Sequence, residues 1–194
     1  MPKKGIKREK GKTYVYLVRH AHFIIPKSPH TYNPHLSLSK KGKIQAKALA
    51  KRLKPLKNDI EVFCCSTMSR AVETAEAVAK VIDKKPVKYQ RLSEFNKLLW
   101  TRKYYCFKYW RYLIRHKLSI RTFNKILEEN AGKVILIVAH GNVIKGIIKN
   151  KLNLSLSKIR ELDYKNCHIT VLKFNGLKLE KSYCINEKKP ITFV

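Results

Sequence analysis

Short apolar runs alternate with amphipathic segments along most of the chain. Residues 13–19, 60–65 and 134–139 are rich in β-branched and other apolar side chains, a pattern typical of strands buried in a sheet. Residues 68–82 and 143–151, which follow two of these runs, carry apolar side chains at helical spacing. Strands that alternate with helices in this way predict a parallel sheet covered by helices.

Local signals predict two further helices. Ser39 suits the N-cap of a helix that ends before Pro55, and Ile44 is one of the apolar positions expected on its buried side. Gly132 suits the left-handed position that ends a helix over residues 118–130. Both helices would cover the sheet.

The C-terminal third predicts an antiparallel hairpin. Residues 167–174 and 177–184 are strand-like and are joined by Asn175-Gly176, a strong hairpin signal. Residues 86–91 predict one more strand. The expected fold is therefore a three-layer α/β/α sandwich with a mainly parallel central sheet, an antiparallel edge hairpin and a small helical cap.

The expected organisation is one domain between two tails. Residues 1–12 predict a basic flexible tail, residues 13–184 the domain, with a cap insertion at about residues 94–117, and residues 185–194 a C-terminal tail. The chain has no acidic residue from position 95 to position 125, and aromatic side chains alternate there with Lys and Arg. Such a segment suits an amphipathic cap, which is the simpler hypothesis, or a surface that stacks on nucleotides.

The charge of the chain favours anionic partners. Its 194 residues include 43 Lys and Arg against 13 Asp and Glu, a formal net charge of +30. A positive field of this size attracts phosphorylated small molecules, and it leaves open a non-specific association of the basic surface with nucleic acid or other polyanions. No apolar run approaches the roughly 18 residues that span a membrane, so no membrane partner is expected.

The cysteines and the N-terminus favour a cytoplasmic protein. The five cysteines show no C-x-x-C spacing, which argues against a disulfide framework and a structural zinc site. Cys64 and Cys65 lie in a strand-like run and are expected to pack in the core. The basic N-terminal residues lead into no signal-type apolar region.

Charged and polar residues follow three predicted strands at the point where each strand ends. Arg19 and His20 follow the first, residues Ser66 to Arg70 follow the second, and His140 and Gly141 follow the strand over residues 134–139. The carboxyl ends of neighbouring parallel strands converge on one crevice. Two arginines and two histidines suit a phosphoryl group better than a metal ion, so no metal or other cofactor is expected.

Each of these side chains has a chemical role that fits phosphoryl transfer. Neutral His20 could attack phosphorus and form a covalent intermediate. Arg19 and Arg70 would bind phosphoryl oxygens and disfavour protonation of His20. His140 would donate a hydrogen bond to an oxygen on which charge accumulates.

Glu94 is the candidate general acid and base. It follows the predicted third strand and is the only acidic residue between Asp83 and Glu128. The alternative is a surface carboxylate paired with a lysine. His20 and His22 form an H-x-H pair that could suggest a metal site, but no clustered carboxylates accompany it.

These residues resemble the histidine phosphatase superfamily, also called the phosphoglycerate mutase-like family. The segments that carry the resemblance are Val18-Arg19-His20-Ala21, Leu38-Ser39-x-x-Gly42-x-x-Gln45-Ala46, Ser66-x-x-x-Arg70-Ala71-x-x-Thr74-Ala75, Leu92-x-Glu94 and Ala139-His140-Gly141. They cover roughly residues 13–184. The resemblance implies metal-independent hydrolysis of phosphomonoesters through a phosphohistidine at His20. It implies phosphate binding by Arg19, Arg70, His140 and Gly141, and acid/base catalysis by Glu94.

The loop after Ala21 departs from the pattern of the family. His22 stands where Glu is common, and Phe23 and Pro26 stand where Thr and Asn are common. We therefore name His22 and Phe23 as candidate substrate-loop residues, and expect a phosphatase rather than a phosphoglycerate mutase-type phosphotransferase. A nucleic-acid or polyanion-binding protein on a catalytically degenerate phosphatase scaffold is the alternative from another class.

Overall fold

The computed structural model describes residues 8–24, 33–94 and 107–184, with the backbone alone for residues 107–112 and 184. Its strands are β1 (Thr13–Arg19), β2 (Ile60–Ser66), β3 (Val87–Tyr89), β4 (Val134–Ala139), β5 (Ile169–Asn175) and β6 (Lys178–Cys184). Its α-helices are α1 (Lys40–Leu53), α2 (Ser69–Ile82), α3 (Phe107–Glu129), α4 (Gly141–Leu152) and α5 (Leu156–Glu161). Two short 3₁₀ helices are η1 (Lys54–Leu56) and η2 (Gln90–Leu92).

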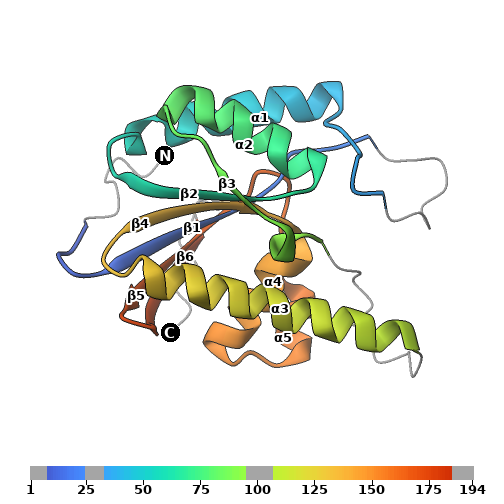
Figure 1. The fold of residues 1–194 in the computed structure, drawn as a ribbon, viewed down its shortest axis with the longest axis vertical. Helices are drawn as coiled ribbons and strands as arrows, with labels where there is room; N and C mark the ends of the chain where they lie inside the picture. The colour runs from blue at the N-terminus through green and yellow to red at the C-terminus, as the bar shows by residue number, and fades with distance from the viewer. Residues whose placement is uncertain (1–7, 25–32, 95–106, 185–194) are drawn as a thin grey trace.

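The strands form one sheet between two layers of helices. Figure 1 shows α1 and α2 on one face and α3, α4 and α5 on the other. The strand order is β3-β2-β4-β1-β5-β6, with the first four strands parallel and β5 and β6 antiparallel at the far edge. The predicted three-layer sandwich, its mainly parallel sheet and its edge hairpin are confirmed.

The central strands consist almost entirely of buried apolar residues. Every side chain of β4 is buried, and so are six of the seven in β1, because helices cover both faces of the sheet. β1 lies directly beside β4, which lies beside β2, and in register Arg19 pairs with Ala139. The carboxyl ends of the three strands therefore meet at one edge of the sheet, as the sequence predicts.

Helix α1 begins and ends where its caps predict, but its buried side differs from the prediction. The Ser39 Oγ accepts a hydrogen bond from the Gly42 N–H at 3.1 Å, the usual N-cap contact. Ile44 is 70% exposed, so its predicted place on the buried side is wrong. The residues of α1 that face the core are Gly42, Ala46, Leu49, Ala50 and Leu53. Their spacing defines a narrower stripe that leaves position 44 in solvent.

Helix α3 is longer than predicted. It begins at Phe107 rather than at residue 118, and it packs on the sheet through Phe123, Ile126 and Leu127. The C-terminal part of the segment predicted as a cap, from residue 107 onward, therefore belongs to a helix that also covers the sheet. Residues 95–106, which hold most of the rest of that segment, lie outside the described residues.

Residues 8–12 contact the sheet through ion pairs. Glu9 Oε2 lies 2.6 Å from Lys173 Nζ in β5, and Lys12 Nζ lies 2.5 Å from Glu180 Oε1 in β6. These contacts join residues 8–12, the described part of the predicted N-terminal tail, to the sheet. Residues 1–7 and 185–194, which complete the two predicted tails, lie outside the described part.

Cys64, Cys65 and Cys167 are buried free thiols, consistent with a packing role; the Cys184 side chain lies outside the described atoms. Among the helices described, none has the length and hydropathy needed to cross a lipid bilayer.

Candidate active site

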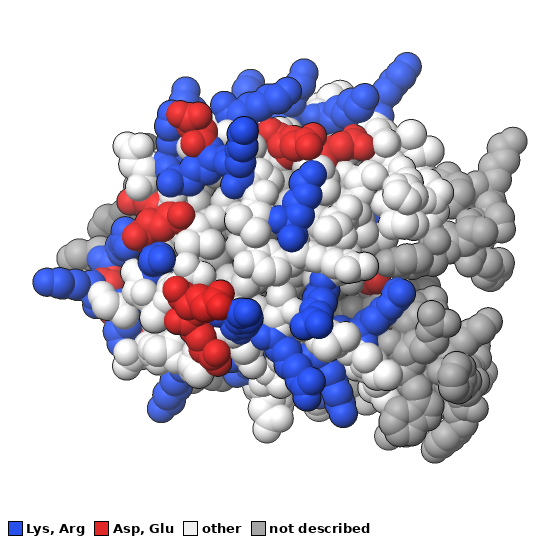
Figure 2. Space-filling model, in the orientation of Figure 1, with Lys and Arg blue, Asp and Glu red and all other residues white. Residues whose placement is uncertain are grey.

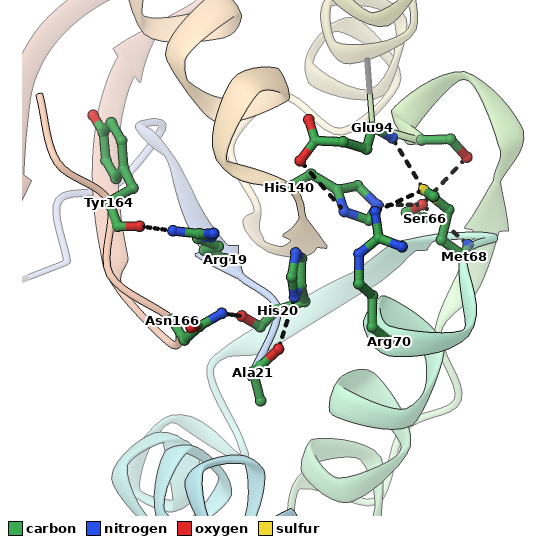
Figure 3. Close-up of polar contacts among 11 residues, drawn as sticks. Arg19, His20, Ala21, Ser66, Met68, Arg70, Glu94, His140, Tyr164 and Asn166 are labelled. Atoms are coloured by element: carbon green, nitrogen blue, oxygen red, sulfur yellow. Dashed lines mark hydrogen bonds and ion pairs between the residues drawn. The ribbon is translucent and has the colours of Figure 1, made fainter. Parts of the chain in front are cut away.

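His20 directly follows β1, and hydrogen bonds to its backbone N–H and to its carbonyl hold it in place. Its N–H donates to the Ala139 carbonyl at 3.0 Å, and its carbonyl accepts from the Asn166 side-chain amide at 2.9 Å. The His20 Nδ1 lies 2.7 Å from the Ala21 carbonyl, which can only accept, so Nδ1 carries the hydrogen. Nε2 therefore keeps its lone pair, and Figure 3 shows this end of the ring pointing into the crevice.

The environment of His20 keeps its imidazole neutral. The residue is 1% exposed, and burial is the main cause that lowers its pKa to about 3. The positive charges of Arg70 and Arg19 lower this pKa further, while the hydrogen bond to Ala21 opposes the shift. The effect of the arginines has the sign that the sequence predicted, although burial is the larger cause.

Arg19, the last residue of β1, is oriented by the segment that precedes β5. Its Nη1 donates to the Tyr164 carbonyl, and its own carbonyl accepts from the Cys167 N–H at 3.0 Å. Together with the Asn166 contact to His20, these bonds fix the end of β1 (Figure 3). Sequence reasoning missed this segment, because no local pattern links residues so far apart in the chain.

Gly141 begins helix α4 beside Arg19. A Cβ atom at position 141 would lie 3.5 Å from the Arg19 Nε, which is an ordinary van der Waals distance. The Arg19 side chain therefore lies against the first turn of α4. The N-terminus of this helix adds a positive dipole end at the crevice.

Arg70 reaches the same crevice from the first turn of α2. The residue is 5% exposed, and its guanidinium carbon lies 4.8 Å from the centroid of the Phe23 ring. Phe23 also lies edge-on to His20, with 5.5 Å between ring centroids. Of the two candidate substrate-loop residues, Phe23 therefore contacts both the predicted nucleophile and a predicted phosphate ligand.

His22, the other candidate, is bound to the start of α1. Its N–H donates to the Gln45 Oε1 at 2.9 Å, and its Nδ1 lies 2.8 Å from the Ser39 Oγ. A Cβ on Gly42 would lie 1.8 Å from the His22 carbonyl oxygen, so only glycine fits at that position. These contacts give His22 a structural place at the base of the loop.

His140 directly follows β4 and is fully buried. Its Nε2 lies 2.8 Å from the Ser66 Oγ, and its Nδ1 lies 3.9 Å from the Glu94 Oε2. The ring centroids of His140 and His20 are 5.0 Å apart. Burial, followed by the charges of His20 and the arginines, lowers the pKa of His140 well below its usual value. Ser66 begins the segment that the sequence places after the second strand, but sequence reasoning assigned it no role.

Glu94 enters the crevice opposite His20. Its N–H donates to the Met68 Sδ at 3.2 Å, and its side chain, 20% exposed, points at His140 (Figure 3). The structure thus brings Arg19, His20, Arg70, Glu94, His140 and Gly141 to one crevice.

Three of these side chains have the geometry to hold a cation. The ligand atoms of His20, Glu94 and His140 lie within 4.8 Å of one another. The carboxylate of Glu94 therefore lies close to both histidines. Sequence reasoning grouped the histidines with two arginines and with no acidic residue. Arg19 and Arg70 place positive charge beside this group, and that charge opposes the binding of a further cation there.

The family model described as the histidine phosphatase superfamily (branch 1) matches residues 15–105 and 117–183. The chain belongs to the histidine phosphatase superfamily. This membership confirms the predicted family and the prediction of an enzyme of the phosphatase type. A comparison with curated proteins gives no match.

Solved structures of other proteins share the fold of this histidine phosphatase. The phosphoserine phosphatase of Entamoeba histolytica, in complex with 3-phosphoglyceric acid, is 17% identical, with a TM-score of 0.65 and coverage of 94% of this chain and 95% of that chain. A putative phosphohistidine phosphatase, SixA, of Agrobacterium tumefaciens is 14% identical (TM-score 0.61, coverage 90% and 96%). A mycobacterial glucosyl-3-phosphoglycerate phosphatase is 17% identical (TM-score 0.63, coverage 90% and 97%).

Proposed function

We propose that the protein is a metal-independent phosphomonoester hydrolase that acts through a phosphohistidine at His20. The observation that carries this proposal is the His20 Nε2, a neutral nitrogen whose lone pair faces a crevice lined by Arg19, Arg70 and His140. This uncharged nucleophile is surrounded by cationic or neutral hydrogen-bond donors, an arrangement that suits a dianionic phosphoryl group.

The first half of the reaction forms the phosphohistidine. The Nε2 of His20 attacks phosphorus as the bond to the ester oxygen breaks, and Glu94 gives its proton to that leaving oxygen. Arg19 and Arg70 bind the phosphoryl oxygens. His140 and the N-terminus of α4 at Gly141 stabilise the charge that develops on these oxygens.

The second half releases phosphate. Glu94, now ionised, takes a proton from a water molecule that attacks phosphorus, and the bond between phosphorus and Nε2 breaks. The electron pair of that bond returns to Nε2, which restores neutral His20. The low pKa of His20 favours this step, because a weakly basic nitrogen is a good leaving group.

The substrates proposed for this crevice are phosphorylated small molecules. Two proteins with this fold, the phosphoserine phosphatase with 3-phosphoglyceric acid and the glucosyl-3-phosphoglycerate phosphatase, are named for such ligands. The altered loop at His22 and Phe23 separates this chain from the usual family pattern. Hydrolysis is therefore proposed ahead of transfer to a second substrate.

An aryl phosphate assay in excess chelator tests the proposal. Purified protein should release phosphate, and His20→Ala should abolish the release, whereas His35→Ala, at an exposed position, should keep the wild-type rate. A denatured, briefly reacted sample should carry acid-labile, alkali-stable phosphate on His20. Full activity of His20→Ala would refute the mechanism, and a requirement for added metal would refute its metal independence.

Removal of either of two proposed phosphate-binding side chains should lower the rate of hydrolysis by orders of magnitude. Arg70→Ala and His140→Ala each remove a donor to the transition state and should lower kcat by about 10²- to 10³-fold. Arg70→Lys keeps the charge but loses both the planar fork and the ring contact with Phe23, so it should recover only part of the rate. Steady-state kinetics of the three variants provide the measurement.

A second candidate function, polyanion binding, is supported by a row of lysines on α1. Helix α1 contains no acidic residue. Lys40, Lys43, Lys47 and Lys51 are exposed and spaced along one side of it. Figure 2 shows Lys and Arg side chains projecting along the edge of the molecule that α1 and α2 form in Figure 1. Such a row could neutralise successive phosphates of a nucleic-acid strand.

A salt titration tests whether this row is a binding surface. Replacing the four lysines of α1 by Gln should lower the log-log salt slope of single-stranded RNA binding by about 3, because each phosphate contact contributes about 0.7. The matched control replaces four exposed lysines elsewhere, which are Lys10, Lys165, Lys178 and Lys181. An equal effect of both sets would show a diffuse charge effect and exclude a dedicated surface.

A further inference from the structure

The hydroxyl of Ser66 is the centre of a buried network beside the crevice. Ser66 ends β2 and is fully buried. Its Oγ lies 2.8 Å from the His140 Nε2, 3.2 Å from the Met68 N–H nitrogen and 3.3 Å from the Ser93 Oγ. Figure 3 shows Ser66 on the side of His140 away from Glu94 and His20. One hydroxyl therefore meets three polar groups.

The Ser66 hydroxyl has a single hydrogen, and this limits which of its neighbours can accept from it and which must donate to it. The Met68 N–H can only donate, so it occupies one of the two acceptor positions of the Ser66 Oγ. One hydrogen and one acceptor position remain for His140 and Ser93. Either Ser66 donates to His140 and accepts from Ser93, or it accepts from His140 and donates to Ser93.

The carboxylate of Glu94, on the other side of the ring, favours donation from Ser66 to His140. The His140 Nδ1 faces the Glu94 Oε2 at 3.9 Å, and when Glu94 is ionised, as in the second half of the proposed reaction, this oxygen is an acceptor only. An N–H at Nδ1 is attracted to that oxygen, whereas a lone pair there is repelled.

We propose that Ser66 is a positioning residue that fixes the tautomer of His140 by donating its hydroxyl hydrogen to Nε2. The neutral ring then carries its hydrogen at Nδ1, on the side of the crevice. This role rests on the proposed function, because only an N–H, and not a lone pair, can stabilise a phosphoryl oxygen at that place. Ser66 itself does not touch the reacting atoms.

Three variants separate this role from a merely structural one. Ser66→Ala should lower kcat on an aryl phosphate by about 10- to 100-fold with little change in KM, the size expected for one lost hydrogen bond in a dry site. Ser66→Thr keeps the hydroxyl and should recover most of the rate. Ser93→Ala removes the other hydroxyl partner, leaves the contact between Ser66 and His140, and should keep the wild-type rate.

Nitrogen-15 NMR of the histidine rings tests the tautomer directly. The wild-type protein and Ser93→Ala should show His140 with its hydrogen at Nδ1, and Ser66→Ala should show a mixture or the Nε2–H form. A wild-type His140 with its hydrogen at Nε2 would overturn the proposal. So would an unchanged kcat and an unchanged tautomer in Ser66→Ala. The wild-type spectrum needs neither turnover nor a folded variant, so failure of the proposed hydrolysis is distinguishable from failure of this inference.

Discussion

Replacing His20 should make the fold more resistant to acid, although it abolishes the proposed activity. Folding lowers the pKa of His20 to about 3, chiefly through burial, whereas an unfolded histidine titrates near about 6.5. Between these values the unfolded chain binds a proton that the folded protein does not bind. The free energy of unfolding therefore falls as the pH falls through this window.

The size of this effect follows from the shift in the pKa. Each bound proton changes the free energy of unfolding by about 1.4 kcal/mol per pH unit. From about pH 7.5 to pH 4.5 the unfolded histidine becomes protonated and the folded one stays neutral, which amounts to about 2.5 kcal/mol. His20→Asn removes this contribution.

Urea unfolding at the two pH values measures the effect. The loss of free energy of unfolding on acidification should be smaller in His20→Asn than in the wild-type protein by about 2 to 3 kcal/mol. A control variant, His35→Asn, changes an exposed histidine in a turn and should lose as much as the wild-type protein. Equal losses in His20→Asn and the wild-type protein would show that the fold does not hold His20 neutral.

Three further substitutions test the crevice and the loop beside it. Glu94→Gln should slow hydrolysis of an alkyl phosphate by about 10²- to 10⁴-fold and that of an aryl phosphate much less, because a phenolate leaves without a proton; equal losses in the two assays would exclude Glu94 as the acid. Phe23→Leu removes the ring against Arg70 and should raise KM for an aryl phosphate severalfold, which Phe23→Tyr should not do; an unchanged KM would contradict this reasoning. Gly42→Ala would place a Cβ 1.8 Å from the His22 carbonyl oxygen and should lower the free energy of unfolding in urea by about 1 to 3 kcal/mol; wild-type stability would count against the packing described.

The sheet was predictable because its strands are buried on both faces. A strand such as β4 has no polar position to interrupt its apolar run, so its bounds agree with those predicted, residues 134–139. The special residues of the crevice were predictable for a related reason. Arg19 and His140 stand where buried runs end, and parallel neighbours bring such ends together.

Other features depend on contacts that local patterns do not contain. Ser66 and His140 are 74 positions apart in the chain, and no periodicity indicates that their side chains meet. The same holds for Asn166, whose amide reaches the His20 carbonyl across 146 positions. Ile44 was misplaced because an apolar residue at helical spacing need not face the core when a narrower stripe suffices. Helix α5 has only six residues, too few to show a period.

The register of β1 and β4 sets the separation of the two histidines. Because Arg19 pairs with Ala139, His20 and His140 are the next residues along two adjacent strands, and their ring centroids lie 5.0 Å apart. That value is close to the spacing of about 4.8 Å between neighbouring strands of any sheet. The gap between the two histidine rings is therefore set by the spacing of the strands. Loops beside it can lengthen or shorten while this gap stays constant, so under the proposed function the substrate would be free to change without a change in the phosphoryl chemistry.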